Sequence, residues 1–385
     1  MRKDWEYKKL GEVAISDLGK TLNKSKDTGT LYPYLCAINI LWDKIDLSTL
    51  KETRFEDDEL ERYTVKYGDL LVCEGGDTGR AAIWDKQETM LYQNALHRIR
   101  LNNEINSRFL LYYLWQLKLN GEIDAKYSKG VTIKHLVKSS LMSIPTPLPP
   151  KPTQLAIVAE LDKINELIQL KKQQLKDYDQ LAQSIFYEMF GDPVENEKGW
   201  EVKKLGEVCE TSSGGTPSKT HTEYYENGTI PWLRSGEVSQ GYIYDAEIYI
   251  SELGLNKSSA KIFPKDTVLI AMYGATVGEV GILCNPMCTN QAICGILPND
   301  LYNSEFLRYV LLSHKDKYLS LASGGAQPNI SQQIIKSTLI PFIDKPLQQQ
   351  FAARIEAIER QKQQVSETIK DLETLLASRM QYWFD

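Results

Sequence analysis

Apolar side chains between Pro152 and Phe190 recur at alternating spacings of four and three residues. This heptad spacing predicts one long α-helix that buries a narrow apolar seam against a second helix. Gly191 and Pro193 follow, and glycine followed by proline is a common way for a helix to end. The seam consists of Ile157, Leu161, Ile164, Ile168, Leu175, Tyr178, Ala182, Ile185 and Met189.

The C-terminal part of the chain repeats this pattern, so the chain supplies the second helix itself. We therefore expect an intramolecular, antiparallel coiled coil with one globular domain at each of its ends. The second seam consists of Phe351, Ile355, Ile358, Val365, Ile369, Leu372, Leu376 and Trp383.

Three basic residues interrupt the two seams, namely Lys171, Lys362 and Arg379. Their apolar stems can lie along the seam while the charges reach water. Alternatively, like a polar residue at a core position of a coiled coil, they fix the register and orientation of the helices.

The globular parts are repeated as well. Trp5–Val13 (WEYKKLGEV) returns as Trp200–Val208 (WEVKKLGEV), and Gln93–Asn94 corresponds to Asn290–Gln291. The chain is therefore a tandem duplication. Its predicted parts are a first domain (1–151), a first spacer helix (152–191), a second domain (192–345) and a second spacer helix (346–385).

Both domains have a mixed pattern, which predicts the α+β class with two tandem α/β domains and an approximate two-fold internal repeat. Helices are expected near Ser107–Lys118 and Ser304–Leu321. Short apolar runs bounded by turn residues predict strands at Leu70–Cys73, Ala81–Trp84, Val268–Met272, Val280–Cys284 and Ile293–Leu297.

Composition limits the class of protein. The 385 residues include 25% charged side chains, which is typical of a soluble protein of two or three domains. No apolar run approaches the ~20 residues of a membrane helix, and the N-terminus lacks the apolar core of a secretory signal. We expect a cytoplasmic protein. Its scattered cysteines contain no Cys-x-x-Cys pair, so Cys284, Cys288 and Cys294 are expected to be reduced thiols rather than metal ligands.

The search for catalytic motifs finds none. Gly214–Thr220 (GGTPSKT) has no glycine directly before its lysine, and Pro217 removes an amide that a phosphate-binding loop would need. No glycine-rich dinucleotide motif and no serine nucleophile motif is present. We therefore expect a binding protein without catalytic residues.

Polar loops with basic, amide and aromatic side chains indicate recognition of nucleic acid. The net charge of −6 argues mildly against this, but the local distribution of charge decides. Arg and Lys suit phosphates and guanine, whereas Asn and Gln suit adenine. The candidates are Lys20, Lys24, Lys26, Trp42, Arg54, Arg80, Gln93, Asn94, Lys129 and Lys134 in the first domain, and Lys219, Arg234, Tyr273, Asn290, Gln291, Gln327 and Asn329 in the second.

These candidates have an alternative interpretation. Any of them can be an ordinary solvated side chain. Gln93–Asn94 and Asn290–Gln291 could equally be buried amides that close a turn in the core.

The whole chain resembles the DNA specificity (S) subunits of type I restriction–modification systems. The resemblance rests on the repeated WxxKKLGEV and on segments of the second half. In the first half, the segment Glu74–Ile83 (EGGDTGRAAI) departs from the sequence that is most common in this family. The second-half segments are Gly214–Val238, Tyr273–Ile282 (YGATVGEVGI), Asn290–Ile296 (NQAICGI), Gly324–Ser331 (GGAQPNIS) and Pro346–Gln350 (PLQQQ).

This resemblance implies that each domain recognises one half of an asymmetric bipartite DNA site, while the spacer helices set the distance and bind partners. The implied partners are double-stranded DNA, two adenine methyltransferase (M) subunits and, through the complex, the restriction (R) subunits. S-adenosylmethionine, ATP and Mg²⁺ are then expected on those partners and not on this chain.

Three alternatives stay open at this point. One is the specificity subunit of a type II system with a bipartite site and fused nuclease–methylase partners. Another is a methyltransferase or nuclease in its own right. The third is a coiled-coil adaptor whose domains bind protein or glycan.

Lengthening both helices tests whether they act as a ruler. Inserting one heptad into each adds about 10.5 Å of helix, which corresponds to roughly three base pairs. We expect the unread spacer of the recognised site to lengthen by that amount when methylated sites are mapped. An unchanged spacer would show that the helices do not set it.

Overall fold

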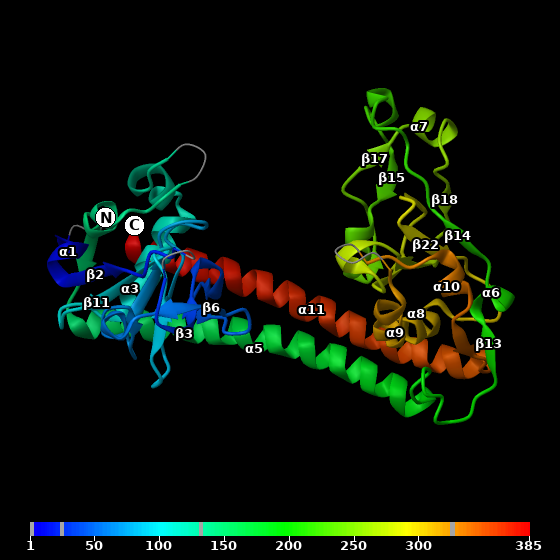
Figure 1. Cartoon of the computed structure of the whole chain (residues 1–385), viewed down its shortest axis with the longest axis horizontal. Helices are drawn as coiled ribbons and strands as arrows, with labels where there is room; N and C mark the ends of the chain where they lie inside the picture. Colours follow the sequence, from blue (N-terminus) through cyan, green and yellow to red (C-terminus); the bar gives the residue numbers. More distant parts are fainter. Residues whose placement is uncertain (1–3, 24–26, 131–133, 324–327) are drawn as a thin grey trace. The chain divides into compact units, whose positions relative to one another are not determined.

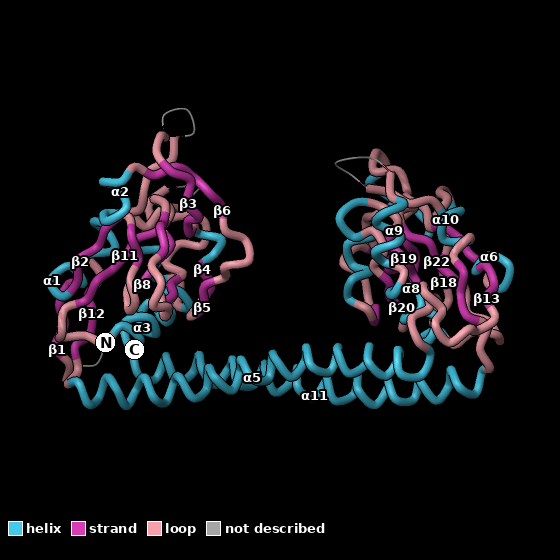
Figure 2. Tube along the Cα trace, turned by 60° about the horizontal axis from the view of Figure 1, so that its bottom comes forward, coloured by secondary structure: helices cyan, strands magenta, loops and turns pink. Residues whose placement is uncertain are grey.

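The computed structural model describes residues 4–23, 27–130, 134–323 and 328–385, and the chain divides into two compact units. The first unit comprises Met1–Gln173 and Ser366–Asp385, and the second comprises Gln174–Val365. Each unit contains one globular domain and a part of both long helices (Figures 1 and 2). The boundary between the two units lies inside both long helices. The predicted domain boundaries instead lie at the ends of these helices, and they stay a prediction. No helix within the described ranges combines the length and apolar character needed to cross a bilayer.

The two predicted long helices are present and uninterrupted. Helix α5 spans Lys151–Phe190 and helix α11 spans Lys345–Phe384, each of 40 residues. Each carries a proline in its first turn, where the missing amide costs no helical hydrogen bond. After α5, Gly191 adopts φ = 75°, a left-handed conformation that glycine tolerates at the end of a helix.

The parts of α5 and α11 run antiparallel within each unit, which confirms the predicted coiled coil. In the first unit, Lys172 Nζ lies 2.7 Å from Glu373 Oε1, and Arg379 pairs with Glu160. In the second unit, Lys362 Nζ lies 2.8 Å from Asp179 Oδ1. Arg379 and Lys362 thus each bind a carboxylate on the other helix, which favours their role in fixing the register.

Every predicted seam residue is buried or half-buried. The expectation of a narrow seam is nevertheless wrong at the helix ends, because additional side chains are buried there. Phe186 and Phe190 pack on Phe306 of the second domain, and Phe384 packs on Phe109 of the first. Each helix therefore buries a broader stripe where a domain covers it.

The first domain contains two four-stranded sheets, β6-β3-β10-β7 and β2-β11-β8-β9, and two strand pairs, β1-β12 and β4-β5. Its helices are α1 (Leu10–Val13), α2 (Asp57–Arg62), α3 (Ser107–Leu119) and α4 (Lys138–Met142). Its strands are β1 (Glu6–Lys9), β2 (Ala14–Leu18), β3 (Thr30–Leu35), β4 (Ile40–Leu41), β5 (Lys44–Ile45), β6 (Lys51–Phe55), β7 (Thr64–Val65), β8 (Leu70–Cys73), β9 (Ala81–Ile83), β10 (Met90–Tyr92), β11 (Leu96–Leu101) and β12 (Pro145–Leu148).

The second domain repeats this plan with the sheets β17-β15-β21-β18 and β14-β22-β19-β20-β16 and the pair β13-β23. Its helices are α6 (Leu205–Val208), α7 (Glu252–Asn256), α8 (Ser304–Ser313), α9 (Lys315–Leu321) and α10 (Gln332–Lys336). Its strands are β13 (Val202–Lys204), β14 (Thr211–Ser213), β15 (Ile230–Leu233), β16 (Tyr242–Ile243), β17 (Tyr249–Ile250), β18 (Ile262–Phe263), β19 (Val268–Ala271), β20 (Val280–Leu283), β21 (Met287–Thr289), β22 (Ile293–Ile296) and β23 (Leu339–Pro341).

The duplication seen in the sequence extends to the pairing of strands. The parallel pair β3/β10 corresponds to β15/β21, and the antiparallel pair β1/β12 corresponds to β13/β23. The predicted strands are confirmed to within one residue at their ends. The prediction of one helix over Ser304–Leu321 is wrong, because His314 separates α8 from α9.

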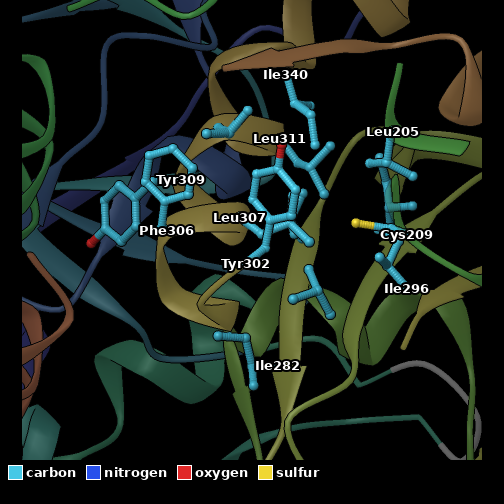
Figure 3. Close-up of a cluster of buried hydrophobic side chains, with 14 of the residues drawn as sticks. Leu205, Cys209, Ile282, Ile296, Tyr302, Phe306, Leu307, Tyr309, Leu311 and Ile340 are labelled. Carbon is cyan, nitrogen blue, oxygen red and sulfur yellow. The ribbon is translucent and has the colours of Figure 1, made fainter. Parts of the chain in front are cut away.

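In the second unit, an apolar core connects the larger sheet to the long helices. Figure 3 shows Phe306 and Leu307 of α8 in one cluster with Ile282 of β20 and Ile296 of β22. Phe351 of α11 belongs to the same cluster. Figure 1 shows α8 and α9 beside this helix, with β15, β17 and α7 on the far side of the domain.

An ionic network of half-buried side chains connects the first domain to α5. Arg108 of α3 donates to both carboxylate oxygens of Asp43, at 3.0 and 2.8 Å, and its Nε donates to Asp162 Oδ1 at 2.7 Å. Asn165 Nδ2 donates to Asp43 Oδ2 at 2.7 Å. Burial raises the pKa of Asp43, and the neighbouring guanidinium of Arg108 acts in the opposite direction.

One buried glutamine near the start of each long helix makes the same three hydrogen bonds. Gln154 accepts from the amide of Asn106 at 2.8 Å and donates to the carbonyls of Glu104 and Pro149, both at 2.9 Å. In the second unit, Gln348 accepts from the amide of Asn303 at 2.7 Å and donates to Leu301 at 3.0 Å and Ile343 at 2.7 Å. We call Gln154 and Gln348 the anchoring glutamines.

Removing an anchoring glutamine should destabilise its unit. In Gln348→Ala, one amide and two carbonyls lose their partner in the core, so we expect the free energy of unfolding to fall by about 3 kcal/mol. Urea unfolding of the whole protein measures this. Gln349→Ala is the matched control, because Gln349 is exposed, and it should change stability by less than about 0.5 kcal/mol. Equal effects of the two substitutions would contradict the anchoring role.

Acid should weaken the first domain through His97. His97 is buried, with Nε2 at 2.7 Å from the carbonyl oxygen of Leu136, and burial lowers its pKa. Below about pH 6.5, the histidine of the unfolded chain binds a proton, whereas the buried histidine of the folded state does not until the pH is lower. The free energy of unfolding should therefore fall as pH decreases from about 6.5 toward the lower pKa of the folded state.

Urea unfolding at several pH values, compared between the wild type and His97→Gln, measures this contribution. We expect the variant to lose less stability on acidification, because a glutamine does not titrate. Identical losses in the two proteins would show that His97 is not responsible.

Candidate nucleic-acid interface

Two of the predicted basic residues in the first domain have structural roles. Lys20 is buried, and its ammonium donates to the carbonyl of Arg54 at 2.9 Å and to the carboxylate of Glu59. Arg54 donates in turn to the carbonyl of Gly29 at 2.8 Å. Lys24 and Lys26 lie outside the described residues. The Lys20 ammonium is therefore engaged inside the domain, and its predicted contact with DNA stays a prediction.

Other candidates of the first domain are dispersed. Trp42 stacks on Trp115 of α3, with 5.1 Å between ring centroids. Arg80 donates to the carbonyl of Ala37 at 2.9 Å, and Lys134 donates to the carbonyl of Asp124 at 2.9 Å. Lys129 forms an antiparallel bridge with His135. The structure does not bring these side chains into one site.

In the second domain, the structure brings four predicted residues together. They line one groove of about 780 Å³ that opens between the loop before β15 and the turn between β21 and β22. The predicted residues are Lys219, Arg234, Asn290 and Gln291, and the others lining the groove are Thr216, Thr222, Tyr225, Glu226, Trp232 and Ile248.

The aromatic walls of this groove are fixed by hydrogen bonds within the domain. Trp232 Nε1 donates to the carbonyl of Gly215 at 2.8 Å, and the Tyr225 hydroxyl donates to the carbonyl of Pro217 at 2.6 Å. The sequence prediction missed both aromatic residues. The signal was present, because both lie in the Gly214–Val238 segment that carried the family resemblance.

The glycine pair before the groove has a packing role. The amides of Gly214 and Gly215 donate to the carbonyls of Ile293 at 3.2 Å and Thr289 at 2.9 Å, so they do not face a ligand. A Cβ added to either residue would lie 2.2 Å from a backbone atom, of Thr289 or of Ser259. Glycine at these two positions lets the loop approach β21 closely.

Two carboxylates hold Arg234 at the edge of the groove. Glu237 is buried and accepts hydrogen bonds from the amides of Arg234 and Glu247, both at 2.9 Å. The Arg234 guanidinium pairs with the Glu247 carboxylate. An arginine held in this way presents its remaining donors in a fixed direction.

The remaining candidates of the second domain lie elsewhere. Tyr273 and Asn329 form an antiparallel bridge with each other and do not line the groove. Gln327 is outside the described residues. Cys288 and Cys294 are buried in β21 and β22, and burial raises their pKa to about 11 and about 12. Within the described ranges, no three His, Cys, Asp or Glu side chains are grouped as metal ligands would be.

Comparison with known proteins identifies the family. The family described as type I restriction modification DNA specificity domain matches residues 2–177 and again residues 197–374. The chain belongs to this family. The two matches coincide with the two copies of the internal repeat.

Relatives agree with this assignment. The chain is 34% identical over 176 residues to the type I restriction enzyme MjaIX specificity subunit of Methanocaldococcus jannaschii, covering 43% of this chain and 40% of that protein. It is 24% identical over 403 residues to the putative MjaX specificity subunit of the same organism, covering 97% and 92% of the two chains. A solved chain of a type I R-M system has the same fold, with a TM-score of 0.59 at 20% identity, covering 100% of this chain and 98% of that chain.

The groove gives a prediction for Lys219, which is exposed. If Lys219 contacts one DNA phosphate, Lys219→Gln should weaken binding equally for all DNA sequences. The slope of log K against log salt concentration should become smaller by about 0.9. Fluorescence anisotropy of the assembled complex on a labelled duplex, at several salt concentrations, measures both.

Lys265→Gln is the matched control, because Lys265 is exposed and does not line the groove. It should leave the slope unchanged. Equal slopes for the wild type and Lys219→Gln would remove Lys219 from the interface.

Proposed function

We propose that this protein is the DNA sequence-recognition subunit of a type I restriction–modification system. Each domain recognises one half of an asymmetric bipartite site. The observation that carries the proposal is that two copies of one framework present different polar side chains at corresponding positions. Where the second domain has Asn290 and Gln291 after β21, the first has Gln93 and Asn94 after β10, so the two amides occur in the opposite order.

The proposed partners follow from this function. The long helices bind two methyltransferase (M) subunits, and the restriction (R) subunits join through the complex. S-adenosylmethionine, ATP and Mg²⁺ bind those partners, and this chain contributes recognition without catalysis. A cytoplasmic location, where chromosomal DNA is accessible, belongs to the same proposal.

The relatives favour this function over the alternatives. They are specificity subunits of type I restriction enzymes, and they match across both halves of this chain. This does not favour a type II specificity subunit with fused nuclease–methylase partners. It also does not favour a methyltransferase or nuclease activity of the chain itself.

Reconstitution tests the proposal. The purified protein is combined with the M subunits of its own cell, unmethylated duplex DNA amplified from that genome by PCR, and radiolabelled S-adenosylmethionine. We expect a shifted duplex and methyl transfer to adenine only when both the protein and the M subunits are present. The protein alone and the M subunits alone are the controls. Methyl transfer by the protein alone, or binding of the complete mixture to no duplex, would contradict the proposal.

A further inference from the structure

A threonine and a carboxamide side chain meet at the same place in both domains. In the first domain, Asn94 Nδ2 donates to Thr21 Oγ1 at 3.3 Å. In the second domain, the Thr216 hydroxyl donates to Gln291 Oε1. We call these the threonine–carboxamide pairs. Thr21 was not among the predicted site residues, and the two pairs become visible only when the domains are compared.

The surrounding backbone places each pair in the same way. The amide of Lys20 donates to the carbonyl of Tyr92 at 3.0 Å, and the amide of Gly215 donates to the carbonyl of Thr289 at 2.9 Å. Tyr92 and Thr289 are the last residues of the corresponding strands β10 and β21. Each threonine is therefore held beside the turn that carries its carboxamide.

Close packing excludes side chains from the approaching segment in both domains. A Cβ on Gly19 would lie 2.4 Å from the backbone of Gln93, and one on Gly214 would lie 2.2 Å from the carbonyl oxygen of Thr289. The repeated close approach is a second observation, independent of the hydrogen bonds. It shows that both domains fix the position of this segment against the turn.

In the second domain, the two neighbouring amide side chains have separate tasks. Asn290 is half-buried and its Oδ1 accepts from the amide of Ala292 at 3.2 Å, so it closes the turn. Gln291 is exposed in the groove. Asn290 therefore has a structural role in the turn, whereas Gln291 is exposed.

The exposed carboxamide of Gln291 carries both a donor and an acceptor, as a side chain that contacts a DNA base requires. A glutamine or asparagine carboxamide donates to N7 and accepts from N6 of adenine in the major groove, which distinguishes A·T from the other pairs. Within the described residues, Thr216 is the one hydrogen-bond partner shown for the side chain of Gln291, so its NH₂ group is available to donate. The threonine restricts the rotation of the amide before DNA binds, which lowers the entropy lost on binding.

The basic side chains near the two turns are already engaged with carboxylates. Lys20 is buried and bound to Glu59, and Arg234 is paired with Glu247. The pairs also differ in reach, because Gln291 is one methylene longer than Asn94. Two carboxamide side chains of different length are consistent with two half-sites of different sequence.

We propose that each threonine–carboxamide pair is a specificity-determining contact, with Asn94 reading an adenine of one half-site and Gln291 an adenine of the other. This inference rests on the proposed function as a DNA-recognition subunit. It assigns the two carboxamides to base contacts and the two threonines to positioning them.

Methylation mapping tests the proposal. Wild type, Asn94→Ala and Gln291→Ala are each expressed with the M subunits in a host that lacks adenine methylation, and methylated adenines are mapped genome-wide. Loss of one bidentate contact should reduce discrimination at a single A·T position by roughly tenfold to hundredfold. The two variants should relax different half-sites, so each serves as the control for the other.

Two further variants distinguish the loss of a base contact from a general loss of folding or stability. Thr216→Val removes the hydroxyl and keeps the shape, so it should relax the same position as Gln291→Ala by a smaller factor. Gln240→Ala replaces an exposed amide that does not line the groove, and it should leave the motif unchanged.

An unchanged motif in either carboxamide variant would overturn the inference and leave the proposed function standing. The same holds if both variants relax one half-site. If a variant methylates nothing, competition binding with duplexes carrying single base changes decides. Loss of discrimination at one A·T position supports the inference, and full discrimination at every position overturns it. Failure of the wild type itself to methylate or bind would instead count against the proposed function.

Discussion

One buried glutamine joins each domain to the long helix that follows it. Gln154 and Gln348 each bind the amide of the asparagine that caps the following domain helix, α3 or α8. A buried amide with all three partners satisfied tolerates little displacement, because any shift leaves polar groups unpaired in the core. The loops of each domain belong to the same compact unit, so this contact helps to hold them in place on the helix.

The charged residues between domain and helix differ between the two units, although both units share the glutamine contact. Arg108, Asp43 and Asp162 form a half-buried ionic network in the first unit. The residue that corresponds to Arg108 in the second domain is Glu305, which is half-buried near Arg308 and whose pKa is raised by desolvation. A glutamate in place of Arg108 would bring two carboxylates together beside Asp162, and like charges at short range repel each other. The charge at the contact between domain and helix therefore differs between the two units.

Sequence patterns predicted the features that repeat, and they failed where contacts join distant residues. The heptad seams and the strands followed from periodicity, because each pattern occurs twice in the chain. The anchoring glutamines were missed, since a glutamine among polar helix residues has no signal of burial. Lys20 was predicted to contact DNA as a basic residue of a polar loop, and its burial was missed because its partners Glu59 and Arg54 are far away in sequence. The groove was found in part, since its amide and basic residues were predicted and its aromatic walls were not.

The central claim is that two unlike domains on one chain recognise two unlike half-sites. The most direct test is to map methylated adenines in the genome of cells with and without this gene. The account predicts that deletion removes one motif, made of two different short sequences separated by a fixed number of unread bases. Persistence of every motif would contradict it, as would a lost motif that is continuous or an inverted repeat.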